Sequence, residues 1–170
     1  MPVNLEIKIP IKSVKIIEKN LISLGAVRKG ILTQKDFYFK IDKGLLKLRK
    51  SNDIYELIKY NRDEKGTRWS NYEILNITGV VPEKYFKSFL NYEKLVEKKR
   101  ILYIYKSTRI HLDIVKKLGT FLELETVVTK NKLNAINEFN HVIKTLKLDA
   151  NMQIRASYRD LLLKKNDNKQ

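Results

Sequence analysis

The chain has 170 residues, of which 43% are hydrophobic and 32% charged, which is typical of a single soluble globular domain. It contains no cysteine, which excludes disulfides, thiolate catalysis and cysteine-ligated zinc and fits a reducing, cytoplasmic compartment. The formal net charge of +16 favours an anionic partner, and no apolar run approaches the length of a membrane span.

The first half of the chain combines one predicted helix with several predicted strands. Apolar and polar residues alternate over residues 3–9, which predicts a strand, whereas residues 12–24 show helical spacing that ends at Gly25. Turn signals separate further extended segments, which we place at about 26–40, 45–50, 54–61 and 68–78. Connections of hairpin length predict a mainly antiparallel sheet.

The second half of the chain repeats this mixture of elements. Helical spacing recurs at 82–93 and 131–147, and a short last helix is predicted at 157–162. Extended segments lie between them, at about 95–105, 108–115 and 120–129. We therefore expect about eight strands and three or four helices in one domain, residues 1–163, followed by a disordered polar tail at 164–170.

Several predicted strands carry aliphatic side chains on one face and ionisable side chains of both signs on the other. The ionisable pairs, each two or four residues apart and so on one face of a strand, are Glu6 and Lys8, Lys47 and Arg49, Lys98 and Arg100, Arg109 and Asp113, and Glu123 and Glu125. An ordinary antiparallel sheet would turn these groups to water. An eight-stranded antiparallel β-barrel with helices outside, an α+β fold, would turn them inward. The amphipathic helices favour the barrel because they need apolar strand faces to cover.

The mixture of acids and bases on these inner faces indicates a particular chemistry. Unpaired buried charges are costly, so the barrel would hold a water-filled tunnel that binds an anion and cations. Basic groups would neutralise phosphates, and carboxylates would hold Mg²⁺ or Mn²⁺ through oxygen ligands. Such a site suits phosphoryl or nucleotidyl transfer. The sequence lacks a Walker-type Gly-rich loop, which argues against an ordinary P-loop enzyme.

Seven short segments form an ordered set of motifs between residue 4 and about residue 163. They are Asn4–Lys8, Gln34–Phe39, Leu46–Arg49, Lys98–Arg100, Arg109–Asp113, Leu118–Glu125 and Ser157–Leu162. Together they resemble the CYTH proteins, the triphosphate tunnel metalloenzymes, and within them the class IV adenylyl cyclase-like branch. That family also includes thiamine triphosphatases and inorganic tripolyphosphatases, and the resemblance implies an eight-stranded antiparallel tunnel with helices outside.

The resemblance also implies roles for individual residues. Glu6, Glu123 and Glu125 would be metal carboxylates, with Asp113 as a further ligand or a supporting acid. The residues that would grip the triphosphate are Lys8, Lys47, Arg49, Lys98, Arg100 and Arg109, with one more base from Lys59 or Arg62, which lie on opposite faces of one predicted strand. Among all of these, Glu6, Lys8 and Glu125 are the predicted catalytic residues.

Three residues qualify this picture. Asn4 stands where the family signature has its first glutamate, so a second metal would lose one negatively charged ligand. Lys47 stands where arginine is common in other branches, and lysine offers a point charge without a bidentate fork. His111 lies on the charged face between Arg109 and Asp113, where a structural role is favoured over a proton shuttle.

The first functional hypothesis is a divalent-metal-dependent enzyme resembling class IV adenylyl cyclase, which converts ATP to cyclic AMP and pyrophosphate. The alternative within the same tunnel is a triphosphatase acting on thiamine triphosphate, inorganic tripolyphosphate or a nucleoside triphosphate. A non-catalytic polyanion or nucleic-acid binder is the alternative from another class, motivated by the net charge of +16 and by Asn4. We expect a triphosphate partner, with no membrane association and no nucleic acid, and homodimer formation stays open.

Overall fold

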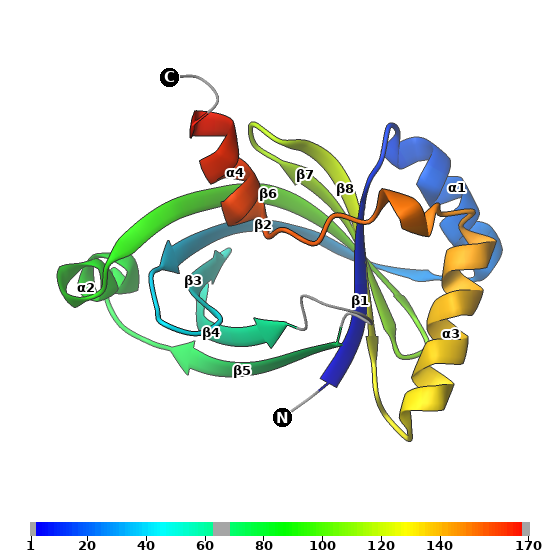
Figure 1. Ribbon diagram of the computed structural model, residues 1–170, viewed down its shortest axis with the longest axis horizontal. Helices are drawn as coiled ribbons and strands as arrows, with labels where there is room; N and C mark the ends of the chain where they lie inside the picture. The colour runs from blue at the N-terminus through cyan, green and yellow to red at the C-terminus, as the bar shows by residue number, and fades with distance from the viewer. Residues whose placement is uncertain (1–2, 63–68, 168–170) are drawn as a thin grey trace.

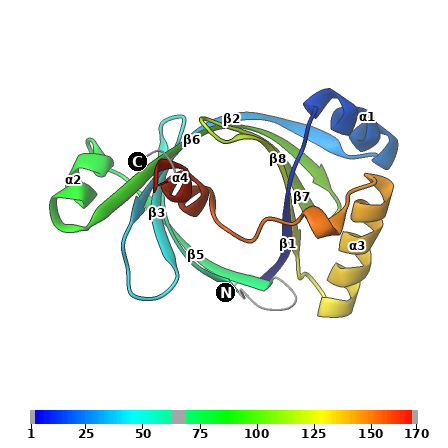
Figure 2. The same cartoon turned by 45° about the horizontal axis from the view of Figure 1, so that its top comes forward.

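The computed structural model describes residues 3–62 and 69–167, and within them eight strands close into a barrel (Figures 1 and 2). The strands are β1 (Val3–Pro10), β2 (Val27–Phe39), β3 (Leu45–Ser51), β4 (Ile54–Arg62), β5 (Trp69–Ile77), β6 (Tyr92–Tyr105), β7 (Thr108–Val115) and β8 (Gly119–Val127). Their order around the barrel is β1-β5-β4-β3-β2-β6-β7-β8, and every neighbouring pair is antiparallel. The predicted α+β fold with an eight-stranded antiparallel barrel is confirmed.

The helices lie outside this barrel (Figure 1). They are α1 (Val14–Leu24), α2 (Pro82–Phe89), α3 (Lys132–Thr145) and α4 (Tyr158–Asp167), with a 3₁₀ turn, η1 (Ala150–Met152), before α4. Helix α1 begins where the Ser13 side chain accepts a hydrogen bond from the Ile16 N–H, and it ends at Gly25, whose φ of 78° suits glycine. In the part of the chain that the structure describes, no helix has the length and apolar composition needed to span a membrane.

The aliphatic strand faces point outward, where α1 and α3 cover them. Leu5 and Ile9 of β1 belong to a buried cluster that also contains Leu21 of α1 and Phe139 and Val142 of α3. Each such side chain contributes about 1.5–3 kcal/mol when it is fully removed from water. The charged residues that alternate with them must therefore face the barrel interior, which decides between the two arrangements that the sequence allowed.

Helix α2 is shorter than its helical spacing predicts. It ends at Phe89, Leu90 adopts an extended backbone with φ −103° and ψ 143°, and β6 begins at Tyr92. The predicted helix over 82–93 is therefore too long at its end. The reason is tertiary: Tyr92 pairs with Phe39 in the β2–β6 ladder, and Phe86 packs against Phe39 from the helix.

The segment between α3 and α4 crosses one end of the barrel (Figure 2). The Ile154 N–H donates to the Lys8 carbonyl oxygen at 2.8 Å, which ties this segment to β1. Helix α4 then packs Tyr158 and Leu162 against the barrel. It continues to Asp167, into the stretch for which the sequence predicts a disordered tail, and Lys165 donates to the Lys117 carbonyl oxygen at 2.6 Å.

Candidate functional site

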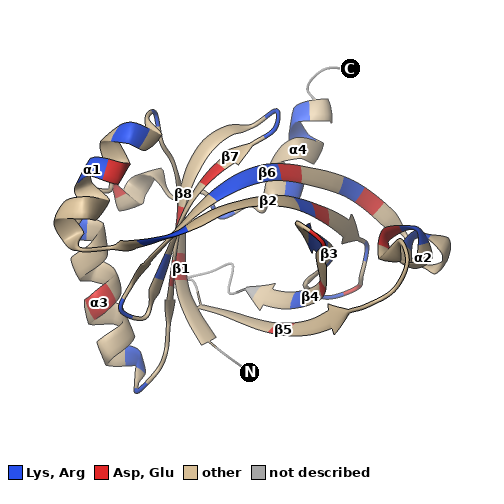
Figure 3. Ribbon diagram, turned by 180° about the vertical axis from the view of Figure 1, so that it is seen from behind, with Lys and Arg blue, Asp and Glu red and all other residues tan. Residues whose placement is uncertain are grey.

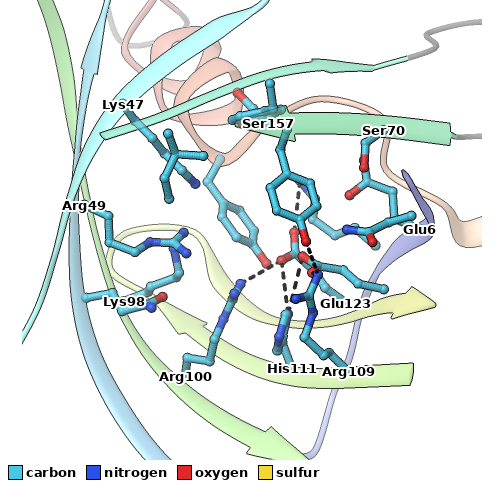
Figure 4. A pocket seen from close by; sticks show the side chains of 18 of the residues that line it. Glu6, Lys47, Arg49, Ser70, Lys98, Arg100, Arg109, His111, Glu123 and Ser157 are labelled. Atoms are coloured by element: carbon cyan, nitrogen blue, oxygen red, sulfur yellow. Dashed lines mark hydrogen bonds and ion pairs between the residues drawn. The ribbon is translucent and has the colours of Figure 1, made fainter. Parts of the chain in front are cut away.

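A cavity of about 270 Å³ lies inside the barrel, and all eight strands contribute to its lining (Figure 4). Each strand turns alternate residues inward, as the pleat of a strand requires. The ionisable lining residues of Lys, Arg, Asp, Glu and His type are Glu6, Lys8, Lys47, Arg49, Glu56, Lys98, Arg100, Arg109, His111, Glu123 and Glu125. Ser157 and Tyr158, which lie at the start of α4, also reach the cavity.

Three bases gather on one side of the cavity around a carboxylate that lies behind them. Figure 4 shows Lys47, Arg49 and Lys98 together on this side. Their common partner is Asp36 of β2, which is fully buried and does not line the cavity. Asp36 Oδ2 accepts from Lys98 Nζ at 2.8 Å and from Lys47 Nζ at 3.1 Å. Arg49 adds a two-pronged contact, with Nε on Oδ1 at 2.7 Å and Nη2 on Oδ2 at 3.0 Å.

These contacts set the charge of the cluster. Burial alone would raise the pKa of Asp36, but Arg49, Lys47 and Lys98 outweigh burial and hold that pKa well below its usual range. Burial lowers the pKa of Lys47 to about 7, repulsion from Arg49 adds to the effect, and Asp36 opposes it. Burial also lowers the pKa of Lys98, again against the attraction of Asp36. The protonated form of each of these two lysines is therefore less stable, relative to the neutral form, than it is in a lysine on the protein surface.

The opposite side of the cavity carries acids and one histidine. The ligand atoms of His111, Glu123 and Glu125 all lie within 4.8 Å of one another. Glu6 stands directly opposite Glu125 in the β1–β8 register, and like charges in that position repel. Figure 4 shows Glu6, His111 and Glu123 on this side of the cavity, away from Lys47. The acids and the cluster around Asp36 thus face each other across one space.

Arginines and a lysine hold these acids in place. Arg100 Nη2 donates to Glu123 Oε2 at 2.7 Å, and Arg109 Nη2 lies 2.9 Å from Glu125 Oε2. Lys8 is 2% exposed, and its Nζ donates to the Ala156 carbonyl oxygen at 2.6 Å and lies 3.7 Å from Glu123 Oε1. Lys8 therefore links the acidic side of the cavity to the segment that crosses the end of the barrel.

The acidic group fits a divalent cation. Burial, followed by repulsion from Arg100, lowers the pKa of His111 to about 4, so its ring is neutral near neutral pH. Its buried Nδ1 has no hydrogen-bond partner among the described residues, and a neutral ring nitrogen is a metal ligand. Burial would raise the pKa of Glu125, but His111, Arg109 and Arg100 lower it, so this carboxylate is ionised and can bind a cation.

Apolar and aromatic side chains also line the cavity, with Glu56 and Ser70 among them on β4 and β5. Leu32 of β2, Ile58 and Tyr60 of β4, and Tyr72 and Ile74 of β5 all line it. Strand β5 carries a single charged residue, Glu73, whereas the first half of β6 carries both acids and bases (Figure 3). Apolar and aromatic surface of this kind suits an organic group more than a bare phosphate chain.

The cavity brings together most of the residues that the sequence singled out. Those that line it are Glu6, Lys8, Lys47, Arg49, Lys98, Arg100, Arg109, Glu123 and Glu125. Lys59 does not: it is exposed, because β4 turns Glu56, Ile58 and Tyr60 inward. Of the two bases that the sequence left open on this strand, Lys59 therefore lies on the outer face. The side chain of Arg62 lies outside the described residues.

Asp113 and Asp36 hold positions that the sequence did not settle. Asp113 is fully buried, accepts from Arg100 Nε at 2.7 Å and from the Tyr158 hydroxyl at 3.1 Å, and does not line the cavity. Of the two roles considered for Asp113, this arrangement suits the supporting acid. Asp36 was part of a motif but was not predicted as a site residue. The sequence did contain one signal for this position. Asp36 shares its face of β2 with Gln34 and Tyr38, both of which line the cavity.

The comparisons with known proteins agree with this architecture. Residues 3–158 match the family model described as CYTH domain. The PH1012 protein from Pyrococcus horikoshii is 24% identical with a TM-score of 0.83, and the alignment covers 93% of this chain and 98% of that one. A candidate adenylate cyclase from Vibrio parahaemolyticus is 16% identical with a TM-score of 0.74, covering 94% and 97% of the two chains.

A third solved structure is similar over somewhat less of the chain. It is a Hippeastrum protein described as an adenylyl cyclase candidate with a dominant triphosphatase activity, 12% identical with a TM-score of 0.58, covering 87% and 89% of the two chains. At these identities, the three likenesses show a shared fold. No curated protein sequence matches the chain significantly.

Proposed function

Because this chain belongs to the CYTH domain family, we propose that it is a divalent-metal-dependent enzyme that processes a triphosphate inside its barrel. The observation that carries the proposal is the separation of charge within one cavity. Lys47, Arg49 and Lys98 lie on one side, and His111 and Glu123 lie on the other (Figure 4). A site for phosphoryl or nucleotidyl transfer needs both parts, because the substrate is a polyanion and its transition state gains from a metal ion.

The bases would bind the phosphate oxygens. Lys47, Arg49 and Lys98 already converge on the single carboxylate of Asp36, and their remaining N–H groups can donate to phosphate. Arg100 lies between the two sides and contacts both Asp113 and Glu123. We therefore assign these four bases, together with Lys8 and Arg109 near the acids, to the triphosphate.

The acids and His111 would hold the metal. Glu6, Glu123, Glu125 and the neutral ring of His111 would supply the ligands for Mg²⁺ or Mn²⁺, which polarises a phosphoryl oxygen and neutralises charge when bound. Asn4, 3% exposed and beside these acids on β1, brings an amide oxygen and no charge. The acids present therefore favour one metal ion over two.

The substrate class follows from the rest of the lining. The apolar surface that includes Ile58, Tyr60 and Ile74 favours an organic triphosphate, such as a nucleoside triphosphate, over inorganic tripolyphosphate. Two reactions are consistent with such a site. Attack by the 3′-hydroxyl of ATP on the α-phosphorus gives cyclic AMP and pyrophosphate, whereas attack by water on the terminal phosphorus of a triphosphate gives orthophosphate and the corresponding diphosphate. The likeness to the Hippeastrum protein keeps the second reaction in the proposal.

A turnover assay with product identification tests the proposal. The protein is incubated with ATP, thiamine triphosphate or tripolyphosphate, each with Mg²⁺ or Mn²⁺, and the products are separated and identified. We expect metal-dependent release of pyrophosphate with cyclic AMP, or of orthophosphate, from at least one of these substrates. Salt-sensitive binding of polyanions without any turnover across this panel would instead support a non-catalytic binder.

A further inference from the structure

The cluster around Asp36 contains two buried lysines that must be charged before they can bind phosphate. Lys47 is 8% exposed and Lys98 is 5% exposed, so neither ammonium group is well hydrated. Burying an ammonium group favours its neutral form, and a neutral amine does not attract an anion. The nearby guanidinium of Arg49 adds repulsion to both lysines.

Asp36 is the carboxylate that opposes these effects. It contacts both ammonium groups, at 3.1 Å for Lys47 and 2.8 Å for Lys98. It reaches them from behind: the three bases line the cavity, and Asp36 does not. Resting on the proposed function, we propose that Asp36 is a positioning residue that favours the protonated forms of Lys47 and Lys98 and directs both side chains at the cavity before a triphosphate binds.

Asp36 is better placed than the other groups around Lys47 and Lys98 to stabilise the charge of both lysines. Among the described residues, the charged and titratable groups that face the two lysines are Asp36 and Tyr38 on β2, Arg49 on β3, Tyr60 on β4, Arg100 on β6, Asp113 on β7 and Tyr158 on α4. Asp113 favours the charged form of Lys98, but it is already bound by Arg100 and Tyr158. The tyrosines present their ring faces to the ammonium groups. Lys47 Nζ lies 5.3 Å from the centre of the Tyr60 ring, and Lys98 Nζ lies 5.8 Å from the centre of the Tyr158 ring.

The contacts also leave the lysines able to bind a ligand. An ammonium group carries three N–H donors, and Asp36 takes one from each lysine. The bidentate contact with Arg49 occupies two of five guanidinium N–H groups. A phosphate can therefore join the cluster from the cavity side while Asp36 stays in place. The contacts with Asp36 therefore leave other N–H groups of the three bases available to a substrate on the cavity side.

The test is the pH dependence of tripolyphosphate binding without metal, measured by titration calorimetry on the full chain. Wild type and Asp36→Asn are compared at about pH 6 and about pH 8, on either side of the Lys47 pKa of about 7. Comparison at the same pH cancels the ionisation of the ligand. At about pH 8 we expect the variant to bind about tenfold more weakly or worse, because each unit by which a lysine pKa falls costs a factor of ten in charged lysine.

Two further results distinguish this role from a merely structural one. At about pH 6 the difference in tripolyphosphate affinity between wild type and Asp36→Asn should shrink to about threefold, because the lower pH restores the lysine charge. Adding Lys47→Arg to Asp36→Asn should recover about tenfold in affinity at about pH 8, because a guanidinium stays charged without help. A loss of equal size at both pH values, without rescue by arginine, would overturn the inference.

A second pair of variants covers the case in which Asp36→Asn does not fold. Lys98→Met removes one buried cation, and Lys98→Met with Asp36→Asn removes the carboxylate as well. The double variant should show the steeper loss of affinity between about pH 6 and about pH 8, and parallel curves would overturn the inference. If wild type binds no tripolyphosphate, the same comparison is made with ATP, and if wild type binds neither, the proposed function fails. If wild type binds the ligand and Asp36→Asn binds it equally well at about pH 8, only the positioning role fails.

Discussion

Replacing Glu125 with glutamine should remove metal binding while leaving the barrel folded. Glu125 is one of the three residues whose ligand atoms lie within 4.8 Å of one another, and glutamine keeps its size but loses its charge. Two effects on stability oppose each other. The ion pair with Arg109 at 2.9 Å is lost, and the repulsion from Glu6, directly opposite on β1, is relieved. Because Arg109 is partly exposed, we expect a net change within about 1 kcal/mol.

The assay is thermal unfolding with and without Mn²⁺. A cation at a hundred times its dissociation constant stabilises a protein by about 2.7 kcal/mol. For a chain of this size, each 1 kcal/mol moves Tm by about 2–4 °C, so wild type should gain roughly 5–10 °C. Glu125→Gln should lose most of that gain and at least about a hundredfold in turnover. Glu73→Gln, which changes an exposed acid outside the cavity, is the matched control and should behave as wild type.

Either of two results would refute this reasoning. One is a Mn²⁺-induced shift of wild-type size in Glu125→Gln, which would place the cation elsewhere. The other is an equal loss of the shift in Glu125→Gln and Glu73→Gln, which would mean that the cation responds to the overall charge of the barrel. A variant that melts far below wild type without metal would show that the charge of Glu125 is needed for folding.

Three further changes test other parts of the structure. Arg49→Lys keeps the charge but loses the bidentate fork, and it should weaken tripolyphosphate binding about tenfold, whereas Lys59→Met on the outer face should leave the affinity unchanged; equal effects in calorimetry would contradict the site. The folded pKa of Lys47, about 7, lies below its usual 10.5, so the unfolded chain binds more protons between these values and stability should rise with pH across them. Urea unfolding should show a smaller rise in Lys47→Met, and an unchanged rise would contradict the pKa shift. Gly44→Ala should cost about 1–3 kcal/mol, because φ is +81° and the added Cβ would collide with Asn61 Oδ1; a variant as stable as wild type would show that the β3–β4 region relaxes freely.

The alternation of side chains carried most of the fold prediction. Glu6 and Lys8 alternate with Leu5 and Ile7, and amphipathic helices needed apolar strand faces, so a barrel with a charged interior followed. Alternation shows which residues share a face but does not show which face is inside. For β4 the sequence left Lys59 and Arg62 on opposite faces, and the barrel register turns Lys59 outward.

The role of Asp36 depends on contacts that no local pattern contains. Asp36 and Lys98 are 62 residues apart and meet because β2 and β6 are neighbours in the barrel although four elements separate them along the chain. His111 was predicted as a structural residue because its contacts, too, come from the pairing of strands and not from its local sequence. Its ring joins Glu123 and Glu125 only through the β7–β8 register, which sets His111 opposite Glu123. Composition and periodicity cannot supply such pairings.

The central claim is that metal and triphosphate share one cavity, and a crystal grown with Mn²⁺ and tripolyphosphate tests it most directly. The anomalous signal of manganese locates the cation without reference to the protein chemistry. We predict a peak bound by Glu123, Glu125 and His111, with phosphate oxygens against Lys47, Arg49 and Lys98. A manganese peak away from these acids, or a triphosphate bound on the outer surface of the barrel, would contradict the account.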